Sequence, residues 1–181
     1  MLERKTGCIH VYTGNGKGKT TAALGLAMRA IGWGMRVCVF QFLKKGVNGE
    51  ARTSDLLGGR LKIVTFDQTH PIFCNGQDKK AAAQKIKTVI TKDLLTVKET
   101  LLMGDYDVVV LDEINNAVHD NLVAKKDILP LLDPRFRRSE IILTGRGAPR
   151  WLIAAADYTT EMRLVKHPYR KGIGARRGIE F

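Results

Sequence analysis

The sequence predicts an α/β fold of three layers, in which a mostly parallel central sheet of about six strands carries helices on both faces. Short β-branched apolar runs alternate along the chain with segments whose apolar residues recur at helical spacing. The expected strand over residues 106–111 ends in an unbroken apolar run, which is typical of a parallel strand buried on both faces. A chain of 181 residues suffices for one domain with a substantial core, so residues 1–181 are expected to form a single domain.

The first half of the chain contains three of the expected strands, over residues 8–13, 36–42 and 61–66. An alanine-rich helix over 19–31 follows the first strand and ends at Gly32 and Gly34, because glycine readily takes the left-handed conformation that stops a helix. A short helix over 50–57 separates the second and third strands. The stretch from 67 to 77 is irregular, since it holds the turn signals His70-Pro71 and Asn75-Gly76.

The second half begins with a long helix over 78–103. One face of this helix is apolar and the lysines lie on the other; the apolar residues are Ile86, Val89, Ile90, Leu94, Val97 and Leu101. A weaker helix over 125–132 follows the strand at 106–111 and ends before Asp133-Pro134. Strands are expected over 140–144 and 158–164, with a helix after Pro149 between them, and the tail from 166 to 181 is basic and rich in glycine.

Residues 14–21 read Gly-Asn-Gly-Lys-Gly-Lys-Thr-Thr and predict a phosphate-binding loop. A strand leads into this segment and a helix leads out of it, which is the context that such a loop requires. Glycines allow backbone N–H groups to point at an anion, and the helix N-terminus adds a partial positive charge. Phosphate contacts are therefore expected along the whole segment, from Gly14, Asn15, Gly16, Lys17, Gly18, Lys19, Thr20 and Thr21.

Two residues of the loop have distinct expected roles. Lys19 should reach the phosphate oxygens, and the hydroxyl of Thr20 should bind Mg²⁺. The spacing departs from the usual G-x-x-x-x-G-K-[ST] pattern, because Thr13 stands where a glycine would be expected. A glycine-rich turn without a ligand is the alternative interpretation, but the strand, the helix, Lys19 and Thr20 together favour a triphosphate site.

Two further motifs are expected at the same edge of the sheet. Asp112 and Glu113 follow a buried strand, and ligands of open α/β sheets bind beyond the carboxyl ends of the strands. Asp112 can hold Mg²⁺ together with Thr20, or it can simply cap the next helix; Glu113 can contact the metal, the ribose or neither. Arg146 lies between two glycines after another strand and is placed to bind phosphate or nucleoside, unless it is an ordinary surface arginine.

The composition limits the remaining classes of function. No apolar run is long enough for a membrane span and no signal-peptide pattern is present, so a cytoplasmic location is expected. Three widely spaced cysteines predict neither a disulfide framework nor a zinc site. The net charge of +12 suits a polyphosphate site, and it also keeps open a nucleic-acid partner.

Taken together, these motifs resemble one family, the P-loop class of ATP:corrinoid adenosyltransferases, which act on cob(I)yrinic acid a,c-diamide or cob(I)alamin. The resemblance covers nearly the whole chain and includes the shortened glycine loop. Its matching stretches are residues 13–23 with Arg29, 41–44 with Gly49-Glu50, 111–115, 144–149, 156–157, 160–162, 166–168 and 178–180.

The resemblance implies a RecA-like P-loop fold and transfer of the 5′-deoxyadenosyl group of ATP to the Co(I) of a reduced corrinoid, with release of triphosphate. It implies that Lys19, Glu113 and Arg146 serve catalysis and that Thr20 and Asp112 hold Mg²⁺ or Mn²⁺. It also implies a homodimer, an electron-donating flavoprotein reductase as partner, and neither nucleic acid nor membrane. The sequence does not indicate which corrinoid is preferred.

Three positions are less clearly assigned. Arg29 matches the family, but on a helix it lies about 15 Å along the axis from Lys19, so it would serve the far end of the nucleotide or a partner subunit. Some family members carry a phenylalanine and a tryptophan after the third strand that press on the lower corrin face. This chain has no tryptophan there, and Phe66 or Phe73 would take that role. His70 in the same loop is a conceivable cobalt ligand, although a loop histidine without a special role is the simpler interpretation.

Two other functions use the same fold. A RecA-like ATPase acting on nucleic acid would explain the charge and the pair Asp112-Glu113, and a small-molecule kinase would explain the phosphate loop. Both would release ADP, whereas an adenosyltransferase releases triphosphate. A kinase also needs a base near an acceptor hydroxyl, and the sequence offers no clear one.

Overall fold

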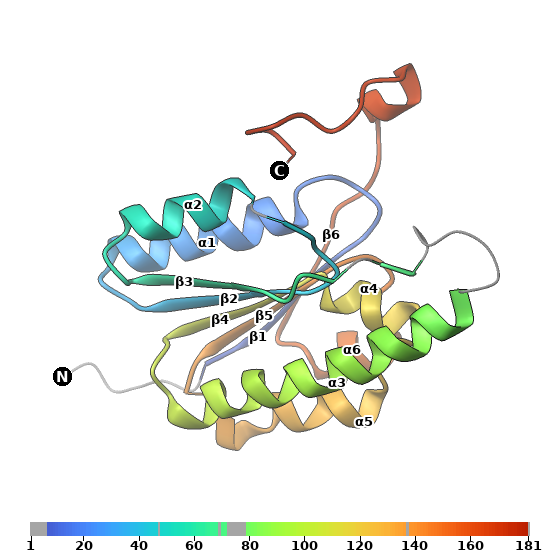
Figure 1. Cartoon of the computed structure of the whole chain (residues 1–181). Helices are drawn as coiled ribbons and strands as arrows, with labels where there is room; N and C mark the ends of the chain where they lie inside the picture. Colours follow the sequence, from blue (N-terminus) through green and yellow to red (C-terminus); the bar gives the residue numbers. More distant parts are fainter. Residues whose placement is uncertain (1–6, 47, 69, 72–78, 137, 181) are drawn as a thin grey trace.

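A six-stranded parallel sheet forms the centre of the molecule, and helices cover both of its faces (Figure 1). The computed structural model describes residues 7–46, 48–68, 70–71, 79–136 and 138–180. The strand order is β3-β2-β4-β5-β1-β6, and neighbouring strands pair in parallel. The strands are β1 (Ile9–Thr13), β2 (Val37–Gln41), β3 (Leu61–Thr65), β4 (Val108–Asp112), β5 (Glu140–Thr144) and β6 (Tyr158–Glu161).

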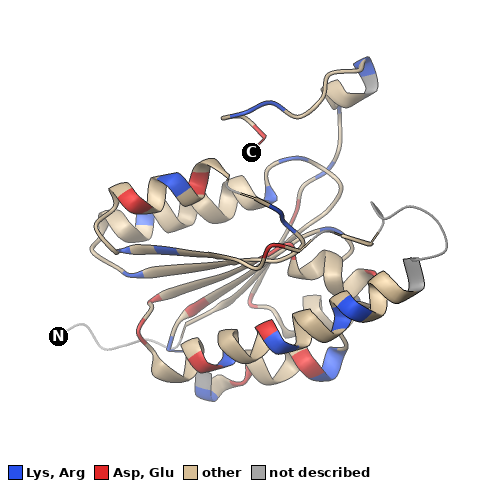
Figure 2. Ribbon diagram, in the orientation of Figure 1, with Lys and Arg blue, Asp and Glu red and all other residues tan. Residues whose placement is uncertain are grey.

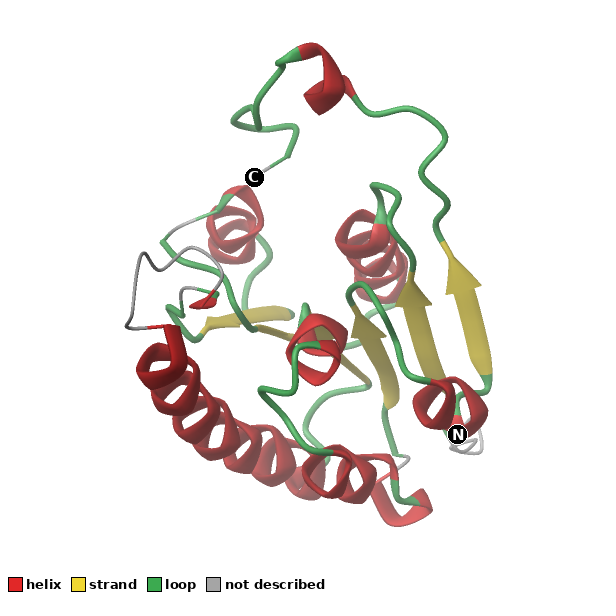
Figure 3. Ribbon diagram, turned by 90° about the vertical axis from the view of Figure 1, so that its right-hand side faces the viewer, coloured by secondary structure: helices red, strands yellow, loops and turns green. Residues whose placement is uncertain are grey.

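One face of the sheet carries α1 (Lys19–Gly32) and α2 (Gly49–Leu56), as Figures 1 and 3 show. α1 presents three small residues to the sheet, Ala23, Ala27 and Ala30, all of them buried. They pack on Val39 and Val110 in the smaller of two apolar clusters. Because alanine is short, the helix backbone can approach the strands closely, and its N-terminus is thereby set at the carboxyl end of β1.

The other face carries α3 (Lys79–Met103), α4 (Ile114–His119), α5 (Lys125–Ile128) and α6 (Arg150–Ala155). Four of the six apolar residues expected on the buried face of α3 are buried, namely Ile90, Leu94, Val97 and Leu101. Ile86 packs at the margin of the core, whereas Val89 lies off the stripe and is exposed. Lys, Arg, Asp and Glu are interspersed along the outer side of α3 (Figure 2).

The expected α/β architecture is confirmed, with a few local differences. The sequence pattern missed α4, because a helix of six residues directly after a strand leaves no periodic signal. The expected helix over 125–132 ends as an α-helix at Ile128 and continues as a 3₁₀ turn over Leu129–Leu132, since Pro130 has no N–H to donate. β6 ends at Glu161, three residues earlier than expected, because Met162 pairs instead with the loop after β1.

Candidate functional site

A cleft of about 1620 Å³ opens at the carboxyl ends of the strands. The loops after β1, β2, β4 and β5 contribute to its walls, and the C-terminal tail lies along its rim. Every expected phosphate-loop residue from Gly14 to Thr21 lines it, together with Glu113 and Arg146. The motifs that the sequence placed at one edge of the sheet therefore meet in a single cleft.

The phosphate loop ends in the conformation that the sequence pattern requires. Gly18 stands at the N-cap of α1 with φ +119°, in the left-handed region that favours glycine. Lys19 begins the helix and is 8 % exposed, and its Nζ donates to the carbonyl oxygens of Gly14 and Gly16, both at 2.8 Å. Burial lowers the pKa of the Lys19 ammonium, and the charge of Arg146 lowers it further. Lys19 is thus a partly desolvated cation aimed into the loop.

The departure from the common glycine spacing has a structural cause. The N–H of Gly16 donates to the carbonyl of Met162 at 2.7 Å, so the loop is pinned to the chain that leaves β6. A Cβ on Gly14, where φ is +97°, would lie 2.5 Å from that same carbonyl oxygen. A Cβ on Gly16 would lie 2.7 Å from the carbonyl oxygens of Met162 and Arg163. Both positions therefore exclude a side chain by close backbone approach.

Gly16→Ala is expected to lower the free energy of unfolding by about 1–3 kcal/mol, because the added methyl would collide with backbone that cannot yield. Gly25→Ala is the matched control: Gly25 lies in α1 with open space around it, and alanine there should raise stability by about 0.5–1 kcal/mol. Urea unfolding of both variants measures the difference. Equal stability of Gly16→Ala and the natural protein would contradict the packing of this loop on β6.

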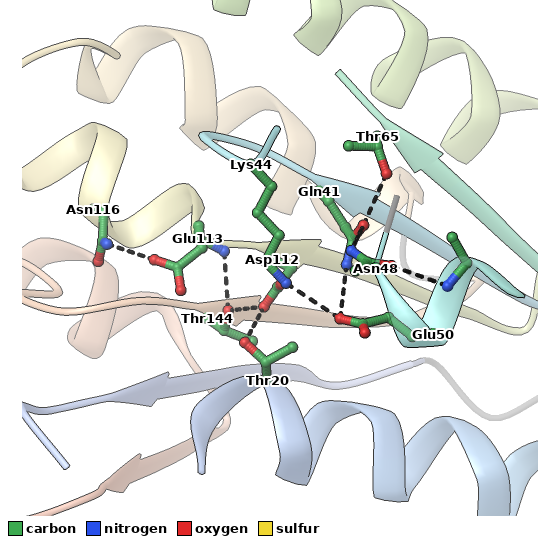
Figure 4. Close-up of polar contacts among 11 residues, drawn as sticks. Thr20, Gln41, Lys44, Asn48, Glu50, Thr65, Asp112, Glu113, Asn116 and Thr144 are labelled. Carbon is green, nitrogen blue, oxygen red and sulfur yellow. Dashed lines mark hydrogen bonds and ion pairs between the residues drawn. The ribbon is translucent and has the colours of Figure 1, made fainter. Parts of the chain in front are cut away.

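Asp112 is the centre of the polar network on the floor of the cleft (Figure 4). Its side chain is fully buried, and Oδ1 accepts from the hydroxyls of Thr20 at 2.8 Å and Thr144 at 2.6 Å. Oδ2 forms an ion pair with Nζ of Lys44 at 2.6 Å. The expected pairing of Thr20 with Asp112 is present, and Lys44 and Thr144 are partners that sequence reasoning missed.

The donor set suits Mg²⁺, which prefers carboxylate, hydroxyl and phosphate oxygens. Thr20 and Asp112 bring a hydroxyl and a carboxylate within hydrogen-bonding distance beside the phosphate loop. Within the described residues, no group of three or more His, Cys, Asp or Glu side chains is arranged to hold a metal ion.

Glu113 stands at the start of α4 with φ +66°, a left-handed conformation that is uncommon for a residue with a side chain. Its N–H donates to Oγ1 of Thr144 at 3.0 Å, and its carboxylate accepts from the side-chain amide of Asn116. Burial and the neighbouring charge of Asp112 raise the pKa of Glu113, against the opposing influence of Lys44, Lys19 and Arg146. The strained backbone turns this carboxylate toward the cleft.

Arg146 reaches the cleft because α4 fixes the loop that carries it. Its N–H donates to Oδ1 of Asn116, and the flanking glycines both have positive φ values. A Cβ on Gly147 would lie 2.4 Å from Nδ1 of His119. The Gly-Arg-Gly motif is thus explained by contact with α4, the helix that the sequence pattern did not reveal.

The structure does not bring every expected site residue to the cleft. Arg29 is exposed in the last turn of α1, where its charge acts on the Tyr12 phenol. Phe66 packs into the core, with its ring centroid 5.8 Å from that of Phe40 and 4.9 Å from that of Phe42, and it does not line the cleft. Phe73 lies outside the described residues.

A second wall of the cleft holds residues to which the sequence analysis gave little weight. His70 lines the cleft, and its Nε2 lies 2.7 Å from Oδ2 of Asp120 at the end of α4. Glu50, from the first turn of α2, lines the opposite side and accepts from Nε2 of the buried Gln41 at 3.1 Å. The buried polar residue Gln41 at the end of β2, followed by Lys44 in the next loop, is the signal that could have revealed this group.

The described residues include no helix with both the length and the apolar content needed to cross a membrane.

Comparisons with known proteins agree with the motifs. Residues 5–181 match the model of the family described as ATP:corrinoid adenosyltransferase BtuR/CobO/CobP. The chain is 34 % identical to the corrinoid adenosyltransferase of Escherichia coli K12, over all of this chain and 89 % of that protein. It is 36 % identical to the corrinoid adenosyltransferase of Pseudomonas aeruginosa, over 97 % of this chain and 84 % of that one.

Among solved structures, the flagellar accessory protein FlaH of Methanocaldococcus jannaschii aligns with a TM-score of 0.58 at 15 % identity, covering 89 % of this chain and 78 % of that one. At this identity the likeness concerns the fold alone, and it agrees with the expected P-loop architecture. The sequence relatives and the match over nearly the full length decide the family: the chain belongs to the ATP:corrinoid adenosyltransferases.

Proposed function

We propose that the cleft binds ATP and a reduced corrinoid side by side and transfers the 5′-deoxyadenosyl group from one to the other. Co(I) attacks the ribose 5′ carbon, the bond from that carbon to the triphosphate oxygen breaks, and triphosphate leaves with the electron pair while cobalt becomes Co(III). The observation that carries this proposal is the convergence of Lys19, Thr20 and Arg146, all from family motifs, on one cleft, where the hydroxyl of Thr20 donates to the buried carboxylate of Asp112.

The size of the cleft supports two substrates. Pockets for one small molecule usually measure about 300–1,000 Å³, and this one measures about 1620 Å³. We place the triphosphate in the loop from Asn15 to Thr21, because that is where the helix N-terminus and Lys19 concentrate positive charge. The sugar carbon then faces the open side of the cleft, where the planar corrin can approach it.

In this arrangement the residues act by position and charge. Lys19 exchanges its two carbonyl acceptors for phosphate oxygens, and Arg146 approaches the same charge from the loop after β5. Thr20 and Asp112 would hold Mg²⁺ or Mn²⁺, which when bound supplies further neutralisation of the leaving triphosphate. Glu113 lies near the charges of Lys19 and Arg146, and its carboxylate holds Asn116, which accepts from the backbone N–H of Arg146. No general base is required, because the nucleophile carries no proton to remove.

The test is to incubate the protein with ATP, Mg²⁺ and chemically reduced cobalamin. We expect a light-sensitive cobalt–carbon product and one triphosphate for each adenosyl group transferred. Release of ADP and phosphate in response to DNA or RNA, with no reaction of the corrinoid, would overturn the proposal. A homodimer and a flavoprotein reductase as electron donor remain predictions, which sedimentation and reconstitution with a reductase can examine.

His70→Ala is expected to raise the KM for the corrinoid by roughly tenfold and to leave the KM for ATP unchanged. The imidazole lines the cleft and is oriented by Asp120, and a hydrogen bond to a polar group at the corrin edge is worth about 1–2 kcal/mol. Steady-state kinetics with each substrate varied in turn measures the effect. A change in the KM for ATP alone would place His70 on the nucleotide side.

A further inference from the structure

The carboxylate of Asp112 has few positions left for a metal ion. Oδ1 already accepts two hydroxyl hydrogens, from Thr20 and Thr144, and Oδ2 is in an ion pair with Lys44 at 2.6 Å. The side chain is fully buried, so no other direction of approach is open to solvent. A divalent cation that binds this carboxylate must therefore contend with the ammonium of Lys44.

We infer that Lys44 is a tethered cation that competes with the divalent metal for Asp112, and that Glu50 is the carboxylate that receives Lys44 when the metal binds. The inference rests on the metal role of Thr20 and Asp112 in the proposed function. It assigns a role to two residues that lie outside the phosphate loop and the strand-end acids.

The ammonium of Lys44 has only a short distance to move between Asp112 and Glu50. Its Nζ lies 2.6 Å from Asp112 and 3.4 Å from Oε1 of Glu50, so it already stands between the two carboxylates (Figure 4). Lys44 is on the loop after β2, and its side chain is about a quarter exposed. A small rotation of its flexible stem transfers the ammonium from one carboxylate to the other without moving the backbone.

Glu50 is held in place to receive the ammonium. Its Oε1 accepts from Nε2 of Gln41 at 3.1 Å, and Gln41 is completely buried. Oε1 of Gln41 accepts in turn from the side-chain amide of Asn48 at 2.7 Å and from the hydroxyl of Thr65 at 2.8 Å. Asn48 also caps α2 by accepting from the N–H of Ala51. These bonds fix the orientation of the Gln41 amide and thereby the position of Glu50.

Electrostatics explains why the lysine must move. A divalent ion on Asp112 would stand within a few ångströms of the ammonium, and like charges at that separation repel strongly in a partly buried site. The negative triphosphate offsets this repulsion. Lys44 therefore disfavours metal without a polyphosphate, so that the metal and the nucleotide enter together.

Titration with Mn²⁺ alone, followed by the electron paramagnetic resonance signal of the free ion, tests the inference without any corrinoid. We expect Lys44→Gln to bind Mn²⁺ about tenfold more tightly than the natural protein and Glu50→Gln to bind it several-fold more weakly. Lys45→Gln, at the exposed neighbouring lysine, should leave the affinity unchanged. Lys44→Arg keeps the positive charge, so its Mn²⁺ affinity should be close to that of the natural protein.

The outcomes separate this inference from the function on which it rests. One outcome is that Mn²⁺ binds the natural protein in the presence of inorganic triphosphate, but Lys44→Gln binds Mn²⁺ no more tightly than the natural protein does. Lys44 then does not compete with the metal for Asp112. If Mn²⁺ does not bind even with triphosphate, the metal role of Asp112 fails and the inference fails with it. If Lys44→Gln does not fold, the Mn²⁺ affinity of Glu50→Gln still tests the inference. An affinity equal to that of the natural protein would overturn the proposed movement of Lys44 from Asp112 to Glu50.

Discussion

Lys19→Ala is expected to slow adenosyl transfer by about a hundredfold to a thousandfold, the loss that follows removal of one preorganised electrostatic contact to a developing charge. Lys19 is the buried cation of the phosphate loop, and burial keeps it poorly solvated and lowers the pKa of its ammonium. Such a charge interacts strongly with phosphate because little water screens it. The leaving triphosphate would therefore lose its principal fixed counter-charge.

The measurement is the rate of formation of the cobalt–carbon product with chemically reduced corrinoid, so that no reductase limits the rate. Lys126→Ala, at an exposed lysine of α5 far from the cleft, serves as the control and should retain full activity. Stability should change little in Lys19→Ala, because the lysine bonds only to the carbonyls of Gly14 and Gly16. A folded Lys19→Ala variant with near-normal turnover would refute the placement of the triphosphate in this loop.

Asp112→Ala is expected to abolish measurable transfer and to lower the free energy of unfolding by about 3 kcal/mol. Removing one member of a buried ion pair leaves the other charge uncompensated, which typically costs about 3–5 kcal/mol. We expect the lower end of that range because the side chain of Lys44 is about a quarter exposed. The hydroxyls of Thr20 and Thr144 also lose their shared acceptor.

Asp112→Asn is the matched control for this second variant. The amide oxygen can still accept from Thr20 and Thr144, so part of the stability should return, while the charge that would hold the metal is gone. Urea unfolding with a chelator present measures stability, and Mn²⁺ titration measures the site. If Asp112→Ala were as stable as the natural protein, the ion pair with Lys44 would contribute nothing to the fold.

Local patterns were sufficient for most of the fold. Short runs rich in β-branched residues predicted the six strands, and the apolar stripe expected on α3 is buried at Ile90, Leu94, Val97 and Leu101. The strands and the apolar stripe of α3 depend on residues that are close together in the chain, so a local sequence pattern can predict them. α4 was missed because it is too short to show a period, and the expected helix over 125–132 was right in place but changes from α-helix to a 3₁₀ turn at Leu129–Leu132.

The candidate site was predictable where a motif carries its own geometry. The loop from Gly14 to Thr21 and the strand-end residue Asp112 line or underlie the cleft as expected. Phe66 shows the limit: as an aromatic residue after β3 it suited a corrin contact, yet it packs against Phe40 and Phe42. Burial of an aromatic ring in the core is favourable by itself, and the sequence pattern cannot tell the two fates apart.

The sequence by itself determined the parallel α/β architecture, the phosphate loop and the family, because each of these is encoded in contiguous residues. Only the tertiary structure decided why Gly14 and Gly16 must be glycines, since the obstacle is the backbone of Met162 and Arg163. It also decided that β5 lies between β1 and β4, and that Lys44 reaches Asp112. Contacts between residues distant in the chain depend on how the whole sheet is ordered, and no local pattern records that order.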